Sequence, residues 1–168
     1  MAIAGIDPGV TGAVTVGDHR GEAIAIHDTP SYTKPVKNRK GIVNRGCFDL
    51  RAMYELLASV PDLELVVLEE VNPFGLAGVA AFSLGSGFLA WQMAAAALNV
   101  PVLLVTPQKW KKEIGIPKGS DKDVSRKKAL QMFPQAEHRL KRKKDHNRAE
   151  STLLYEIGRR HLGHRPIP

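Results

Sequence analysis

The segment that most constrains the fold is Ile3–Gly9, which has the sequence IAGIDPG. Its small and apolar residues predict a short buried strand, and Pro8-Gly9 ends that strand directly after a carboxylate. A carboxylate at the end of a buried strand is costly to desolvate unless a cation meets it. Asp7 is therefore either a turn residue, since Asp-Pro-Gly is ordinary turn chemistry, or part of a charged site.

The order of the remaining strand and helix signals predicts an α/β fold. Two further short strands follow the first through tight turns, which predicts an antiparallel meander. Two strand–helix units then add parallel strands, giving a five-stranded mixed sheet flanked by helices. The expected strands are 2–7, 12–16, 22–27, 64–70 and 102–105, the last one buried on both faces, and the expected helices are 50–57, 79–98, 108–114, 124–133 and 145–161.

The stretch between Glu70 and Lys109 holds no charged residue and is longer than the roughly 20 residues that a membrane-spanning helix needs. Proline and glycine interrupt it repeatedly, so we expect a loop, a buried helix and a buried strand and no membrane span. The helix expected at 79–98 is rich in Ala, Gly and Ser, which lets its backbone come close to its neighbours. We expect it in the core, although it could also serve as a dimer face.

Length and composition are those of one globular domain covering residues 1–168, with 43% hydrophobic and 24% charged residues. The only cysteine, Cys47, cannot form an internal disulfide, which fits a reducing compartment. The first predicted strand begins at once and no targeting segment is visible, so we expect a cytoplasmic protein.

Positive charge is concentrated in two parts of the chain. Residues 106–148 hold 14 Lys and Arg against 5 Asp and Glu, a net charge of +9, while the rest of the chain carries −2. A second basic stretch at 29–46 shows no periodicity, so we expect a loop that is either mobile or ordered by a ligand. A basic region on a nearly neutral body favours a polyanion partner, most simply a nucleic acid, over a merely solvated basic face.

Acidic residues occur at three places where the expected fold could bring them together. Asp7 ends the first strand, Glu69 and Glu70 end the strand at 64–70, and Asp145 and Glu150 begin the last helix. Clustered carboxylates repel one another and are tolerated mainly when divalent cations lie among them. Mg²⁺ prefers carboxylate, water and phosphate oxygens, so the set is typical of a metal-dependent nuclease.

Three motifs resemble one family. Gly5–Gly9 (GIDPG), Leu68–Val71 (LEEV) and Lys141–Glu150 (KRKKDHNRAE) resemble the RuvC-type Holliday junction resolvases, most closely their phage and plastid branch. The resemblance extends from residue 3 to about residue 160. It implies a ribonuclease H-like fold, consistent with the expected order of elements, and a protein that is bacterial or encoded by a phage.

The resemblance also implies roles for particular residues. Asp7, Glu69, Asp145 and Glu150 would ligate metal, with two Mg²⁺ per site that Mn²⁺ could replace, and Glu69 is preferred to Glu70. Lys122 would lie near the scissile phosphate, or else be a surface lysine in the first turn of a helix. Asp145 and Glu150 are five residues apart, about 140° around a regular helix. Either Asp145 lies in a non-helical turn, or His146 replaces it as ligand or general acid/base.

The activity implied is Mg²⁺-dependent resolution of four-way DNA junctions, in which a homodimer nicks two strands symmetrically. Two alternatives remain open: a ribonuclease H-like nuclease for other branched DNA or RNA–DNA hybrids, and a non-catalytic DNA-binding accessory protein. Phe74 would either stack on an unpaired base or lie in the core. The expected DNA-binding side chains are Lys34, Lys37, Arg39, Lys40, Lys109, Lys112, Arg126, Lys127, Lys141, Arg142, Lys143, Lys144 and Arg148.

Overall fold

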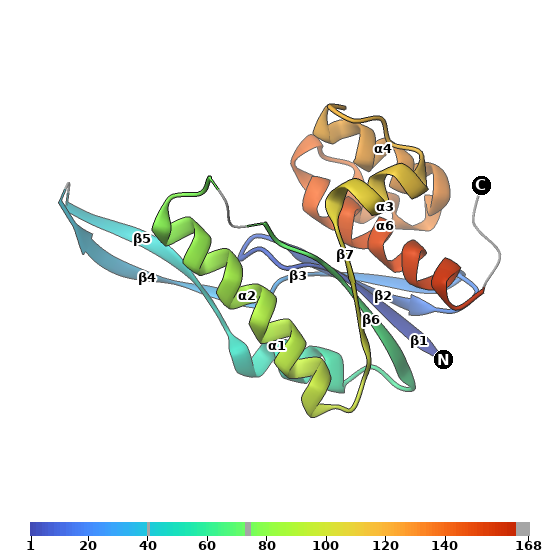
Figure 1. Cartoon of the computed structure of the whole chain (residues 1–168), viewed down its shortest axis with the longest axis horizontal. Helices are drawn as coiled ribbons and strands as arrows, with labels where there is room; N and C mark the ends of the chain where they lie inside the picture. The colour runs from blue at the N-terminus through green and yellow to red at the C-terminus, as the bar shows by residue number, and fades with distance from the viewer. Residues whose placement is uncertain (40, 73–74, 164–168) are drawn as a thin grey trace.

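The computed structural model describes residues 1–39, 41–72 and 75–163 and contains the expected five-stranded mixed sheet (Figure 1). The strand order is β3-β2-β1-β6-β7, with β1 paired antiparallel to β2 and parallel to β6. The pairs β2–β3 and β6–β7 are antiparallel and parallel, respectively. The five strands are β1 (Ala2–Asp7), β2 (Ala13–Asp18), β3 (Ile24–Asp28), β6 (Leu63–Glu69) and β7 (Val102–Val105).

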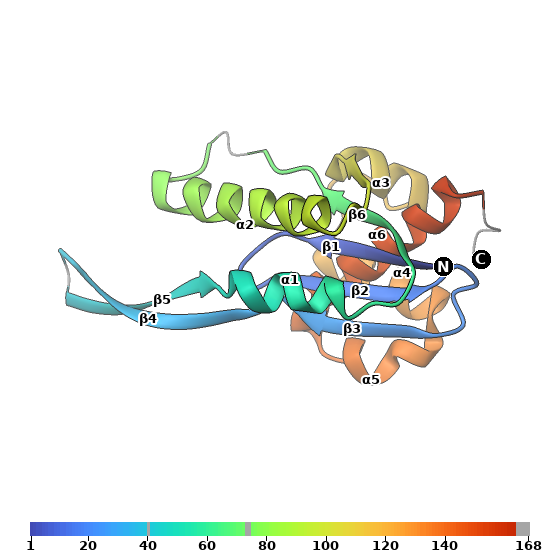
Figure 2. The ribbon, with the colours of Figure 1, turned by 90° about the horizontal axis from the view of Figure 1, so that it is seen from below.

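Each face of the sheet is covered by helices, so the molecule has two cores. Because side chains alternate along a strand, β6 sends Val66 and Leu68 to one core and Leu65 and Val67 to the other. Helices α1 (Leu50–Ala58) and α2 (Gly78–Ala97) cover the first core. The second core lies under the C-terminal elements (Figure 2), which are α3 (Pro107–Ile114), α4 (Lys122–Met132), the 3₁₀ turn η1 (Pro134–Ala136), α5 (Glu137–Leu140), the 3₁₀ turn η2 (Lys143–Asp145) and α6 (His146–His161).

Local capping explains where several helices begin. Asp49 accepts a hydrogen bond from the Ala52 N–H at the start of α1, and Thr106 caps α3 ahead of a proline at its first position, as the sequence predicts. Helix α4 begins two residues before the expected position. Its N-cap is Asp121, whose carboxylate accepts a hydrogen bond from the Asp123 N–H.

Close contact between α6 and β1 fixes the start of α6 beside the end of β1. A side chain at Gly5 would collide with the backbone of Ser151 and Tyr155, so glycine is required for this approach. The Thr15 hydroxyl on β2 bonds to that of Ser151 at 2.8 Å, and the Asn147 amide donates to the Thr11 carbonyl oxygen at 2.7 Å. These contacts hold the first turns of α6 over the carboxyl end of β1.

Two expectations about burial are wrong. Helix α2 lies on the sheet with only one side, and its buried residues are Gly87, Trp91, Ala94 and Ala95. It is the one helix in the described ranges that is long and apolar enough to cross a membrane, with 22% of its most apolar window buried. One such helix is weak evidence for a span. Strand β7 is parallel as expected but lies at the sheet edge, so Leu104 is 40% exposed.

The basic stretch expected as a loop forms an antiparallel hairpin of β4 (Ser31–Asn38) and β5 (Gly41–Phe48). This hairpin is a separate two-stranded sheet that projects from the body beyond the end of α2 (Figures 1 and 2). Most of its residues are exposed on both faces. Without a buried face, the sequence has no reason to alternate apolar and polar residues, so the strands carry no periodic signal.

Candidate active site

Asp7 and Glu69 lie side by side because they end two neighbouring parallel strands. The register pairs Ile6 with Leu68, which places the next residue of each strand at the same edge of the sheet. Glu69 accepts a hydrogen bond of 2.8 Å from the indole N–H of Trp110, a fully buried residue of α3. Glu70 is exposed and follows the end of the strand, so the structure brings Glu69 and not Glu70 to Asp7.

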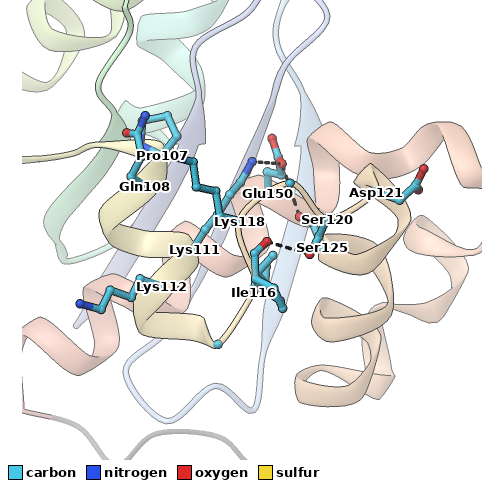
Figure 3. Close-up of a pocket in the computed structure, with 13 residues that line it drawn as sticks. Pro107, Gln108, Lys111, Lys112, Ile116, Lys118, Ser120, Asp121, Ser125 and Glu150 are labelled. Carbon is cyan, nitrogen blue, oxygen red and sulfur yellow. Dashed lines mark hydrogen bonds and ion pairs between the residues drawn. The ribbon is translucent and has the colours of Figure 1, made fainter.

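Glu150 reaches the same place from the first turns of α6. Its carboxylate pairs with the Lys111 ammonium at 2.9 Å and accepts from the Ser125 hydroxyl at 3.4 Å (Figure 3). Three carboxylates from β1, β6 and α6 therefore share one site with one lysine. Within the described part of the chain, no three potential metal ligands are already gathered in the geometry of a metal site.

The electrostatics of this site are those of an under-neutralised acidic cluster. Burial, and then the negative charges of Glu69 and Glu150, raise the pKa of Asp7 to about 7, although the Gly9 N–H and Lys111 act to lower it. Burial also raises the pKa of Glu69, although the hydrogen bond from Trp110 acts to lower it. At neutral pH the three carboxylates therefore hold more negative charge than Lys111 offsets, which favours binding of a further cation.

A cavity of about 670 Å³ opens beside the cluster, between α3 and the start of α4 (Figure 3). Glu150 and Ser125 line it together with three lysines, Lys111, Lys112 and Lys118. The loop between α3 and α4 also lines the cavity, and in this loop Gly115 and Gly119 have φ of 82° and 80°. Cations around an acidic centre give this cavity the chemistry of a phosphate-binding site.

Asp145 is the last residue of the 3₁₀ turn η2 and directly precedes α6. Its carboxylate is 4% exposed and accepts from the Arg142 side chain at 2.8 Å and from Arg148 at 3.2 Å. Burial acts to raise its pKa, but the hydrogen bonds from Arg142 outweigh this and leave the pKa below its usual value. The structure therefore groups Asp145 with arginines and not with Asp7, Glu69 and Glu150.

His146 begins α6 and is half-buried. It is four residues before Glu150, so the two side chains share a face of the helix. His146 therefore lies on the side of α6 that carries Glu150, whereas Asp145 precedes the helix.

The predicted DNA-binding cations fall into two groups. Arg126 pairs with Asp123 at 2.6 Å, Arg148 pairs with Asp28 at 2.6 Å, and Arg142 holds Asp145, so these three arginines have carboxylate partners within the protein. Lys127 pairs more loosely with Asp123, at 3.5 Å. The other described cations of the predicted set are all exposed: Lys34, Lys37 and Arg39 on the hairpin, Lys109 and Lys112 on α3, and Lys141, Lys143 and Lys144 before α6.

Some predicted residues lie outside what the structure describes. Lys40 and Phe74 are not among the described residues, and Lys122 begins α4 with a side chain that is not described. Sequence reasoning also missed Trp110 and Ser125, and it expected the basic cluster 109–112, which includes Lys111, only to bind phosphates. The spacing of Trp110 and Ile114 on α3 marks its buried face, and Lys111 lies beside that face. Only the packing of α3 against α6 shows that Lys111 meets Glu150.

Two solved structures of RuvC from Thermus thermophilus resemble the chain over nearly its whole length. The first is 18% identical, with a TM-score of 0.58, and the match covers 97% of each chain. The second, RuvC in complex with a Holliday junction substrate, is 17% identical with the same TM-score and coverage. No protein-family model and no curated protein matches the chain. The chain therefore has the ribonuclease H-like fold of RuvC, the fold that the sequence motifs implied.

Proposed function

We propose that this protein is a metal-dependent endonuclease that resolves four-way DNA junctions. The observation that carries the proposal is the convergence of Asp7, Glu69 and Glu150 from three elements, beside a cavity lined by lysines. The likeness in fold to a RuvC that was solved with a Holliday junction supports the choice of substrate. The motifs at residues 5–9, 68–71 and 141–150 support it independently of the fold.

The donor set fits Mg²⁺ because it consists of carboxylate oxygens, the ligands that this ion prefers. We infer that Asp7, Glu69 and Glu150 hold the metal, with His146 at the fourth place and Mn²⁺ as a substitute for Mg²⁺. The bound ions would neutralise the scissile phosphate and activate water for hydrolysis. Lys111, released from Glu150, and its neighbour Lys112 would hold phosphate oxygens at the rim of the cavity.

A cleavage assay on defined substrates tests the proposal. A four-way junction, a Y-fork, an RNA–DNA hybrid and a plain duplex of matched sequence would each be incubated with Mg²⁺ and with EDTA. We expect paired, symmetric nicks in the junction alone, and only with Mg²⁺. Equal cutting of plain duplex would refute junction selectivity. Cutting of the hybrid would instead favour a ribonuclease H-like activity, and cutting of nothing would favour an accessory role.

Asp7→Asn separates chemistry from binding. The substitution removes one charge from the cluster without changing the side chain's size, so cleavage should fall below detection while junction affinity stays within about threefold. Single-turnover cleavage and binding in EDTA measure the two properties. Glu70→Gln, at the neighbouring exposed acid, is the matched control and should cleave normally. An Asp7→Asn protein that retains cleavage would exclude Asp7 as a ligand.

The proposed homodimer would use the solvent face of α2. Val79, Phe82, Leu89 and Met93 are 64%, 71%, 59% and 61% exposed and are spaced by three, seven and four residues, so they stack on one side of the helix. The residues buried against the sheet lie on the opposite side. A helix that is apolar on both sides needs a partner for each, and a second copy of α2 would cover the exposed side in a two-fold dimer.

A further inference from the structure

The hairpin of β4 and β5 carries a concentrated positive charge. Between Thr29 and Phe48 the chain has five Lys and Arg and no Asp or Glu. The strand register places Lys34 directly opposite Arg45, so both side chains lie on the same face of the ribbon. Like charges in directly opposed positions destabilise a strand pair. An anion lying across the pair would remove that cost.

The base of the hairpin is attached to the body close to the candidate active site. Phe48 packs against α2 at Gly87, where an added side chain would also collide with the Pro8 carbonyl oxygen. A side chain at Gly46 would meet Val10 at 3.1 Å, so the β1–β2 turn that follows Asp7 contacts the hairpin directly. The register puts Gly46 and Phe48 on one face of the ribbon and the Lys34–Arg45 pair on the other.

The dimensions of the hairpin suit duplex DNA. Each strand has eight residues, which span roughly 26 Å at about 3.3 Å per residue. That length corresponds to about eight base pairs at roughly 3.4 Å each. A two-stranded ribbon also fits the major groove, and Ile42, near the tip, is 76% exposed.

We propose that this hairpin is a DNA-binding arm that lies along a duplex arm of the branched substrate, with Lys34 and Arg45 on the phosphate backbone. The inference rests on the proposed function for the identity of the substrate. Because the base of the arm contacts the turn after Asp7, a duplex held along it would lead toward the carboxylate cluster. The arm would thereby set how far from the branch point the scissile phosphate lies.

The test compares DNA binding by the full chain and by Lys34→Gln/Arg45→Gln. Fluorescence anisotropy in EDTA, from 0.05 to 0.3 M salt, would use a four-way junction and a plain duplex of 20 base pairs. Loss of two phosphate contacts should reduce the slope of log Kd against log salt by about 1.8. The same loss weakens binding at 0.1 M salt by up to roughly 60-fold. Both substrates should be affected alike, because the arm contacts duplex and not the crossover.

Arg20→Gln/Arg51→Gln is the charge-matched control, since it removes two exposed positive charges that lie outside β4 and β5. It should change the slope by less than half as much. Lys34→Gln alone, at an exposed position, should reduce the slope by about 0.9, and it serves as a second test in case the double variant misfolds. Thermal melting confirms that each variant is folded.

Three results would refute the proposal that the hairpin binds duplex DNA. They are a double variant that binds DNA like the control, a loss of affinity for the junction alone, and a change of oligomeric state in sedimentation without a change in affinity. The binding assay needs no cleavage, so the two proposals fail separately. A wild-type protein that cuts nothing but binds duplex through the hairpin would refute the nuclease and keep the arm. If the wild type cleaves the junction but the double variant binds DNA normally, the nuclease proposal stands and the arm is refuted.

Discussion

Asp7 shows how one residue couples the chemistry of the site to stability. Its folded-state pKa of about 7 lies above the ordinary value of 3.8, so the folded protein retains a proton that the unfolded chain releases. As pH rises between these two values, the stability of the metal-free protein should fall, and the loss is complete by about pH 8, one unit above the folded-state pKa. The carboxylate cluster is therefore a stability cost that a bound cation would relieve.

Asp7→Asn should remove this pH dependence. In EDTA, the stability advantage of the variant over wild type should grow by on the order of 2 kcal/mol between pH 5 and pH 8 and stay constant above pH 8. Urea unfolding at pH 5, 7 and 8 measures the gap. Glu64→Gln, at an exposed acid on β6, should show a gap that does not vary with pH. A constant gap for Asp7→Asn as well would mean that Asp7 ionises normally.

Asp145 and Glu150 belong to the same motif but have different surroundings, so their amides should behave differently. Asp145→Asn leaves Arg142 and Arg148 without their buried carboxylate and should lower the free energy of unfolding by roughly 1–3 kcal/mol. Glu150→Gln should keep stability within about 1 kcal/mol and lose cleavage. Urea unfolding and single-turnover cleavage of both variants decide the roles. Full stability with no cleavage in Asp145→Asn would place that acid in the site.

At the scale of elements, close backbone approach decides where α2 lies. Gly87 and Gly85 are both in this helix, but a side chain at Gly87 would meet Phe48 and the Pro8 carbonyl, while one at Gly85 would meet nothing within 4 Å. Gly87 therefore joins three parts of the molecule, namely α2, the base of the hairpin and the turn after Asp7. The small-residue composition of the helix serves this contact on one side only.

The two glycines give a matched pair of substitutions. Gly87→Ala should destabilise the protein by roughly 1–3 kcal/mol through overpacking. Gly85→Ala should stabilise it by roughly 0.5–1 kcal/mol, because alanine is the better helix former in an open position. Thermal melts of both variants check the sign of each effect. Equal effects at the two positions would contradict the contact at Gly87.

At the scale of the whole molecule, the proposed dimer depends on the exposed apolar side of α2. Phe82→Lys places a charge in the middle of the apolar stripe and should convert a dimer into a monomer. Leu50→Lys, at a residue of α1 that is 63% exposed, is the matched control and should remain dimeric. Sedimentation velocity measures the state. A monomeric wild type, or a dimeric Phe82→Lys protein that still nicks symmetrically, would exclude this interface.

Much of this architecture could be predicted because its signals are local. Pro8 and Pro107 mark where elements end or begin, and the apolar runs at 64–70 and 102–105 define the parallel strands. The five-stranded sheet followed from that order. The hairpin was missed because strands exposed on both faces carry no periodicity. The burial of α2 was overestimated because the apolar composition of a helix does not show which of its sides packs against the rest of the chain.

What the sequence alone determined is therefore the order of strands and helices, and with it the edge of the sheet where Asp7 and Glu69 end together. The structure decided which further side chains join them. Glu150 meets Lys111 and Ser125 because α6 packs on β1 through Gly5, whereas Asp145 turns to Arg142 and Arg148. Spacing along a chain fixes periodicity within an element, but the direction in which a side chain points is set by packing between elements.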